Sequence, residues 1–267
     1  MGLTAPETRL LDAALEVALA AGAAALRHQG APAEDKPDGS PVTAADRAAH
    51  AAIVEGLGRL TPELPVLSEE SLPEHVAGRR SWPRFWLVDP LDGTKEFLKR
   101  SGEFTVNVAL VAGSEPVLGV VHVPAQDVTY SARLGDGAQV RRGSQPPVAI
   151  RVRALAPGTV LVLASRDHGG PELEAILARV PGASRASAGS ALKFGLLAEG
   201  RADLYVRTRP TMEWDTAAGQ CLLEAAGGRV TDLSGRRLSY NKASLVNPSF
   251  VAWGDTACDW PRRLAGA

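Results

Sequence analysis

WLVDPLDGTKEF, residues 86–97, begins as an apolar run and then places Asp89 and Asp92 on either side of a proline. Because Pro90 cannot donate to a strand ladder, the buried strand is expected to end at Asp89. Two carboxylates three residues apart repel each other unless a cation lies between them. Carboxylates are the hard oxygen ligands that hold Mg²⁺ in proteins. This stretch therefore indicates a divalent metal site.

The second half of the same stretch indicates an anion site next to the metal. Gly93 and Thr94 stand where the helix TKEFLKR should begin. The first backbone N–H groups of a helix lack intrahelical partners and favour an anion such as phosphate. Gly93 has no Cβ to keep a phosphate away from the backbone. The alternative from the residues alone is that DPLDG is a type I turn capped by its aspartates.

Three more acidic residues stand at the end of a predicted strand or the start of a predicted helix. Glu69 and Glu70 follow the strand PVLS, and Asp215 follows Trp214. These acids are candidates to share cations with Asp89 and Asp92. Their alternative roles are simple ones, because Glu69 and Glu70 also suit a solvated loop and Asp215 also suits a helix cap.

The order of the predicted elements favours an α+β fold built in layers. Helices are expected over residues 5–29 and 43–59, and residues 104–153 have the short runs and turn residues of an antiparallel meander. Helices and strands then alternate to the end of the chain. We expect sheets sandwiched between helix pairs, with an N-terminal α+β subdomain at 1–154 that carries most metal ligands and a C-terminal α/β subdomain at 155–267.

The overall composition excludes several classes of protein. The net charge of −1 over 267 residues argues against a general nucleic-acid binder. The Ala-rich first helix carries charges within its apolar pattern and does not suit a signal peptide or a membrane span. We expect a cytoplasmic protein without a transmembrane segment, and peripheral contact with the inner membrane stays open. Cys221 and Cys258 are isolated and are expected to be buried thiols.

Four ordered motifs, SPVTAAD, PVLSEES, DPLDGTKEF and EWDTAAGQCLLEAAGG, span nearly the whole chain. Together they resemble the magnesium-dependent, lithium-sensitive phosphatases of the inositol monophosphatase superfamily. Lys95-Glu96 after DGT, with GEFTVNVALV, LASRDH and GSALKF, further resembles the CysQ-type 3′(2′),5′-bisphosphate nucleotidase branch. The resemblance implies a layered αβαβα sandwich of the inositol monophosphatase or sugar phosphatase type.

The resemblance also implies a role for each acidic residue. One Mg²⁺ would be held by Glu69, Asp89 and the backbone carbonyl of Leu91, and a second by Asp89, Asp92 and Asp215. A third, weaker ion near Glu69 is an additional option. Spacing does not separate Glu69 from Glu70, so the first acid is taken from the family pattern. The residues implied to orient and deprotonate the attacking water are Asp46, Thr94 and Glu69, and those implied to hold the phosphate are Leu91, Asp92, Gly93 and Thr94.

The implied reaction is in-line attack of water on the 3′-phosphate of adenosine 3′,5′-bisphosphate, which releases AMP and phosphate without a covalent enzyme intermediate. A second phosphate requires cations, and the candidates are Lys193, Arg166 and His168. Ser190 and Asp215 are also expected to touch the substrate, and Lys193 is alternatively a surface cation. The competing functions are an inositol or sugar phosphate phosphatase and a non-catalytic nucleotide-binding protein. Both a monomer and a homodimer fit the sequence.

Overall fold

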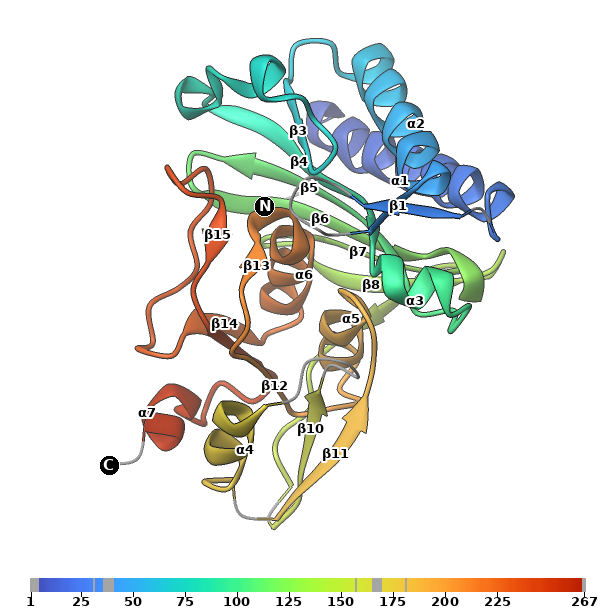
Figure 1. Cartoon of the computed structure of the whole chain (residues 1–267). Helices are drawn as coiled ribbons and strands as arrows, with labels where there is room; N and C mark the ends of the chain where they lie inside the picture. Colours follow the sequence, from blue (N-terminus) through green and yellow to red (C-terminus); the bar gives the residue numbers. More distant parts are fainter. Residues whose placement is uncertain are drawn as a thin grey trace.

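The first layer is a pair of helices, α1 (Ala5–Arg27) and α2 (Ala44–Leu60). The structure is a computed structural model that describes residues 5–30, 32–35, 41–156, 158–164, 170–180 and 182–265. A capping box starts α2, because the Thr43 side chain accepts a hydrogen bond from the Ala45 N–H and Asp46 accepts one from the Thr43 N–H. The helix pair covers one face of a large sheet (Figure 1).

The second layer is a seven-stranded sheet in the order β3-β4-β5-β6-β7-β8-β9. Only β3 and β4 run parallel, and the other neighbours are antiparallel. The meander expected over residues 104–153 is therefore confirmed. The strands are β3 (Val66–Ser68), β4 (Arg84–Asp92), β5 (Thr105–Ala112), β6 (Glu115–Val123), β7 (Val128–Arg133), β8 (Gly137–Arg142) and β9 (Val148–Ile150).

Strand β4 continues through Pro90, which corrects the expectation that it ends at Asp89. Asp89 lies opposite Asn107 and Asp92 lies opposite Thr105, so β4 has one more residue than β5 between these pairs. Residues three apart on a regular strand point to opposite faces, and the extra residue of a bulge reverses that alternation. Pro90 is tolerated at the bulge because the ladder is already interrupted there. The bulge brings Asp89 and Asp92 to the same side of the sheet.

The remaining three layers complete an αβαβα sandwich, as the resemblance implied (Figure 1). Helices α5 (Leu192–Ala198) and α6 (Glu213–Ala225) lie between the first sheet and a second sheet, within one apolar core. Helices α4 (Pro171–Leu177) and α7 (Trp260–Ala265) cover the outer face. The second sheet has the order β11 (Ala183–Ser187), β10 (Val160–Ala164), β12 (Leu204–Arg207), β16 (Phe250–Trp253) and β14 (Arg229–Asp232).

Shorter elements connect these layers. The elements are β1 (Ala33–Asp35), β2 (Pro41–Thr43), α3 (Thr94–Leu98), β13 (Thr211–Met212), β15 (Val246–Asn247) and the 3₁₀ turns η1 (Pro73–Val76), η2 (Arg79–Ser81) and η3 (Pro124–Gln126). None of the helices in the described ranges has the length and apolar character needed to cross a membrane. Cys221 and Cys258 are both free and buried, as expected.

Candidate metal centre and phosphate pocket

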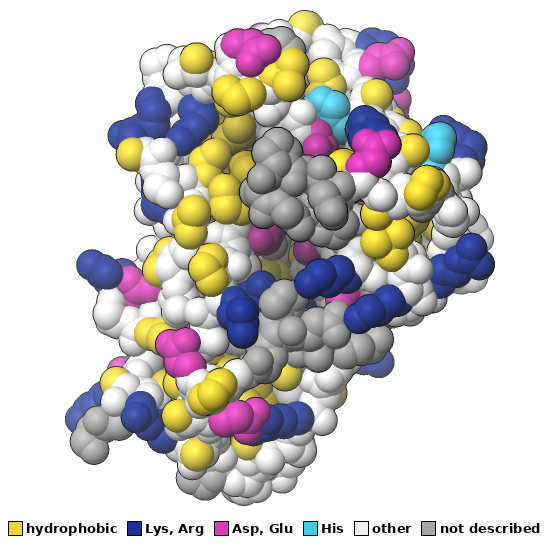
Figure 2. Space-filling view, viewed as in Figure 1, with side chains coloured by type: hydrophobic (Ala, Val, Ile, Leu, Met, Phe, Trp, Pro, Cys, Tyr) yellow, Lys and Arg dark blue, Asp and Glu magenta, His cyan; other side chains and the backbone are white. Residues whose placement is uncertain are grey.

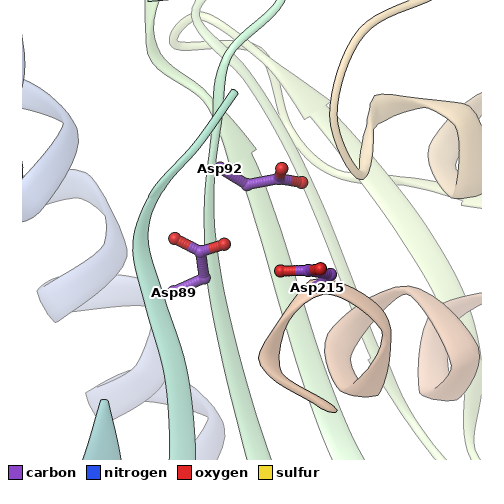
Figure 3. A group of neighbouring side chains, drawn as sticks. All are labelled: Asp89, Asp92 and Asp215. Carbon is purple, nitrogen blue, oxygen red and sulfur yellow. The ribbon is translucent and has the colours of Figure 1, made fainter. Parts of the chain in front are cut away.

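Three aspartates from two distant parts of the sequence converge between the first sheet and α6 (Figure 3). Asp89 and Asp92 come from the bulged end of β4, and Asp215 comes from the first turn of α6. One carboxylate oxygen from each lies within 4.8 Å of the other two. Asp89 is buried, and the other two aspartates are partly exposed. This is the geometry of carboxylates that share cations.

The electrostatics of the trio also fit a bound cation. Burial, followed by the charges of Glu69, Asp92 and Asp215, raises the pKa of Asp89 well above its usual range. Burial and the charge of Asp92 likewise raise the pKa of Asp215 well above its usual range. Buried carboxylates that repel each other are stabilised in their ionised form by a nearby positive charge. This set of hard oxygen donors therefore fits Mg²⁺.

The two acids of the Glu69-Glu70 pair act on different parts of the site. Burial is the main cause of the raised pKa values of Asp89 and Asp215, and the charge of Glu69 raises them further. The charge of Glu70 instead contributes to the raised pKa of Asp46, for which burial is again the main cause. Glu69 is thus the acid of the pair whose charge acts on two of the three aspartates, Asp89 and Asp215. This distinction depends on the end of β3 and was not available from spacing.

Asp215 caps a helix and also belongs to the aspartate group, so the cap does not exclude it as a candidate metal ligand. Its carboxylate Oδ2 accepts a hydrogen bond from the Met212 N–H at 2.7 Å, which caps α6. The same side chain also meets Asp89 and Asp92. The cap fixes the position of the carboxylate, because the start of the helix determines where the side chain lies.

The segment after Asp92 is tightly packed against the residues that precede α5. Gly93 has a φ of +91°, and a Cβ at this position would lie 2.1 Å from the Ser190 Oγ. Ser190 donates to the Asp92 carbonyl at 2.8 Å, and the Ala191 N–H donates to the Asp92 Oδ2 at 2.6 Å. Ser190 has a left-handed φ of 49° and precedes α5. Only glycine fits at position 93 without moving Ser190.

A pocket of about 220 Å³ extends from Asp92 and Asp215. Figure 2 shows acidic side chains deep in a hollow at the middle of the molecule and basic side chains along its lower edge. Ser190 and Lys193 both line the pocket, together with residues that the sequence did not single out. Those further lining residues include Phe194, Tyr205, Arg207, Thr211, Thr216 and Phe250.

Lys193 is buried and is not the surface cation that the sequence offered as an alternative. Its Nζ donates to the Ala188 carbonyl at 3.1 Å and lies 5.1 Å from the centre of the Tyr205 ring. Burial lowers the pKa of Lys193 to about 8, and the nearby charge of Asp92 opposes this shift. Lys193 therefore gives the pocket a poorly hydrated positive charge beside an aromatic face.

The remaining predicted site residues that the structure describes belong to α2, α3 and β4. The Asp46 Oδ2 accepts hydrogen bonds from the N–H and hydroxyl of Thr43, at 2.7 and 2.6 Å. Thr94 is the first residue of α3 and lines the pocket. The Leu91 N–H donates to the Asp89 Oδ1 at 3.0 Å. Arg166 and His168 lie outside the described residues.

The fold and the site together define the class of protein. The model of the inositol monophosphatase family matches residues 7–259. The chain belongs to the inositol monophosphatase family.

Relatives of the chain are more specific. The 3′(2′),5′-bisphosphate nucleotidase CysQ of Escherichia coli is 47% identical over 246 residues, covering 90% of this chain and 98% of that protein. CysQ of Salmonella typhimurium is 50% identical over 80% of this chain and 86% of that protein. The crystal structure of CysQ from Bacteroides thetaiotaomicron superposes with a TM-score of 0.81 at 43% identity, over 92% of this chain and 97% of that one. The resemblance to the CysQ-type branch is confirmed.

Proposed function

We propose that this chain hydrolyses the 3′-phosphate of adenosine 3′,5′-bisphosphate to give AMP and phosphate, with magnesium as cofactor. The observation that carries the proposal is the convergence of Asp89, Asp92 and Asp215 at a pocket that also holds a buried lysine. The enzyme class, a 3′(2′),5′-bisphosphate nucleotidase, is confirmed by the CysQ relatives, which match most of the chain.

The residues proposed to hold metal are Glu69, Asp89, Asp92, Asp215 and the carbonyl of Leu91. Two Mg²⁺ ions suit this set, and a third near Glu69 remains part of the proposal. When bound, Mg²⁺ supplies positive charge beside the phosphate ester and lowers the pKa of water. The carboxylates would hold that charge at the pocket, because the Asp215 carboxylate is fixed by its bond to the Met212 N–H and the Asp92 carboxylate by its bond to the Ala191 N–H.

Three residues are proposed to handle the phosphate and the attacking water. The first N–H groups of α3 are free of intrahelical bonds and are proposed to bind a phosphate oxygen, and Gly93 is the residue that lets this turn pack against Ser190. The Thr94 hydroxyl, at the pocket wall, is proposed to orient the water for in-line attack. Asp46, with its raised pKa, is proposed to take part in moving the proton from that water.

The opposite wall of the pocket suits a nucleotide that carries a second phosphate. Lys193 and Arg207 supply two positive charges for that phosphate, and Ser190 supplies a hydroxyl donor. Tyr205 and Phe250 contribute aromatic rings whose centres lie 5.3 Å apart. Both rings are buried, and they give this wall of the pocket an apolar surface that suits the base of a nucleotide better than a polyol. An inositol monophosphate has neither a base nor a second phosphate and would leave these groups unused.

A phosphate-release panel in magnesium tests the assignment. The substrates are adenosine 3′,5′-bisphosphate, inositol 1-phosphate and fructose 1,6-bisphosphate, each with and without lithium. We expect preference for the adenosine bisphosphate, inhibition by lithium and loss of activity in Asp215→Asn. Preference for inositol 1-phosphate or the sugar bisphosphate would overturn the branch, and no release from any substrate would favour a non-catalytic nucleotide-binding protein.

Three broader expectations stay proposals. We retain the division into subdomains at 1–154 and 155–267, which places Asp215, Ser190 and Lys193 in the second subdomain. A cytoplasmic location, with or without contact at the inner membrane, and a monomeric or homodimeric state are also predictions. Size-exclusion chromatography with light scattering measures the oligomeric state directly.

A further inference from the structure

A fully buried carboxylate lies two residues before the proposed metal ligand Asp215. The side chain of Glu213 is 0% exposed, whereas that of its ion-pair partner Lys242 is 27% exposed. The Glu213 Oε1 accepts hydrogen bonds from the Lys242 Nζ at 2.7 Å and the Lys242 N–H at 3.0 Å. Its Oε2 accepts one from the Asn241 N–H at 2.7 Å. Every contact of this carboxylate described here therefore goes to residues 241 and 242.

The segment that carries Lys242 also fixes the turn before Asp215. Strand β15 pairs with β13, so that Met212 lies opposite Val246. The Asn247 Nδ2 donates to the Met212 carbonyl at 2.7 Å, and the Lys242 Nζ donates to the Asn247 Oδ1 at 3.3 Å. The Met212 N–H in turn donates to the Asp215 Oδ2, and this hydrogen bond caps α6. The Glu213–Lys242 pair is thus connected to the cap in two ways. Glu213 follows Met212 in the chain, and Lys242 bonds to Asn247, which bonds to the Met212 carbonyl.

The same segment reaches back toward the strand that holds the other two aspartates. Arg79 of η2 donates to the Asn241 Oδ1 at 2.9 Å and to the Ala243 carbonyl at 3.0 Å. The Asn241 Nδ2 donates in return to the Arg79 carbonyl at 3.0 Å. Asn241 has a left-handed φ of 59°, a conformation that asparagine tolerates better than most residues. Since η2 leads directly into β4, the segment joins the regions that supply Asp215 and Asp89.

An ion pair with one fully buried partner contributes little net stability, because the cost of desolvating the Glu213 carboxylate offsets its attraction to Lys242. A positional role explains the pair better. Asp215 faces two other carboxylates, and their repulsion pushes it out of place unless the start of α6 is held rigidly. We propose that Glu213 and Lys242 are positioning residues that hold Asp215 in its metal-binding position. The inference rests on the proposed metal ligands.

Manganese titration of the metal-free, full-length protein without substrate tests the inference, with free Mn²⁺ followed by electron paramagnetic resonance. The variants are Lys242→Met and Glu213→Gln. Removing a partner that orients a metal ligand weakens metal affinity by about 10- to 100-fold. We expect a loss of about tenfold in Glu213→Gln and a several-fold loss in Lys242→Met. If Lys242→Met does not fold because it leaves the buried Glu213 carboxylate without a counter-ion, Glu213→Gln decides, because the Lys242 ammonium that remains in that variant is partly exposed.

The matched control is Glu224→Gln on the same helix. Glu224 pairs with Arg237 at 2.7 Å and its side chain is 11% exposed, but it lies near the other end of α6. We expect this control to lose thermal stability and keep wild-type Mn²⁺ affinity. Wild-type affinity in both test variants, or an equal loss in the control, would overturn the inference. The result is independent of substrate, so a failure of the proposed function would appear separately, in the wild-type phosphate-release panel.

Discussion

Asp89→Asn should make the metal-free protein more stable and remove most of the stabilisation that magnesium provides. Burial and the charges of Glu69, Asp92 and Asp215 raise the pKa of Asp89 well above its usual value. A carboxyl whose pKa is raised by folding destabilises the folded state as the pH rises from its unfolded pKa to its folded pKa. The penalty is therefore present at neutral pH and disappears in acid. Asparagine removes the charge and retains an oxygen that can accept from the Leu91 N–H.

The size of the effect follows from the spacing of the trio. Carboxylate oxygens 4.8 Å apart repel each other by about 3.5 kcal/mol per ionised pair at an effective dielectric constant of about 20. Protonation within the cluster reduces this repulsion, so we expect a gain of about 1–3 kcal/mol, or about 2–4 °C in Tm for each kcal/mol. Magnesium at 100 times its Kd adds about 2.7 kcal/mol to the wild type. The variant should lose most of that increment.

Thermal unfolding followed by circular dichroism, in EDTA and in saturating magnesium at neutral pH, measures both effects. Asp232→Asn is the control. Burial raises the pKa of Asp232, but hydrogen bonds from Ser234 and Arg236 outweigh burial, so that the pKa lies below its usual value. That variant should lose stability equally in both buffers. The reasoning is refuted if Asp89→Asn is less stable than wild type in EDTA, or if magnesium stabilises it as much as wild type.

Three further substitutions address the rest of the site. Gly93→Ala brings a Cβ to 2.1 Å from the Ser190 Oγ, so it should lower Tm and cut phosphate release at least about 100-fold. The control is Gly113→Ala, which is also at positive φ but whose Cβ would meet no atom within 4 Å, and it should stay active. Lys193 loses its charge as the pH rises through its pKa of about 8, so KM for adenosine 3′,5′-bisphosphate should rise above that pH in wild type. In Lys193→Met, KM should already be raised about tenfold and vary little over this pH range, and the same steep pH dependence in this variant would refute the role. Thr94→Val should lower kcat by about 100-fold and leave Mn²⁺ affinity unchanged; a parallel loss of Mn²⁺ affinity would assign Thr94 to the metal site.

The parts of the fold that could be predicted are those set by local pattern. The helix that begins after Thr43 and the meander after Phe104 are encoded in their capping and turn residues, and both are present. The grouping of Asp89, Asp92 and Asp215 was expected from chemistry and from the family resemblance. The bulge in β4 was missed because it is defined by pairing with β5, although Pro90 was a usable signal.

The pocket wall was harder to predict because it depends on packing between distant layers. Lys193 is buried only because α5 is enclosed between the two sheets, and sequence spacing does not report that depth. Ser190 takes a left-handed conformation while bonded to the Asp92 carbonyl, a contact across 98 positions. Tyr205 and Arg207 stood in an ordinary strand pattern, and only the three-dimensional structure brings them to the pocket.

The bulged end of β4 and the start of α3 provide Asp89, Asp92 and Gly93, whereas β12 and β16 provide Tyr205, Arg207 and Phe250. Apart from Asp215, the residues proposed for bond cleavage and those proposed to recognise the departing alcohol thus come from separate stretches of the gene. Mutations in β12 or β16 can change which ester is accepted without altering the cleavage apparatus. A division of this kind allows descendants of one ancestral hydrolase to acquire new substrates through few substitutions.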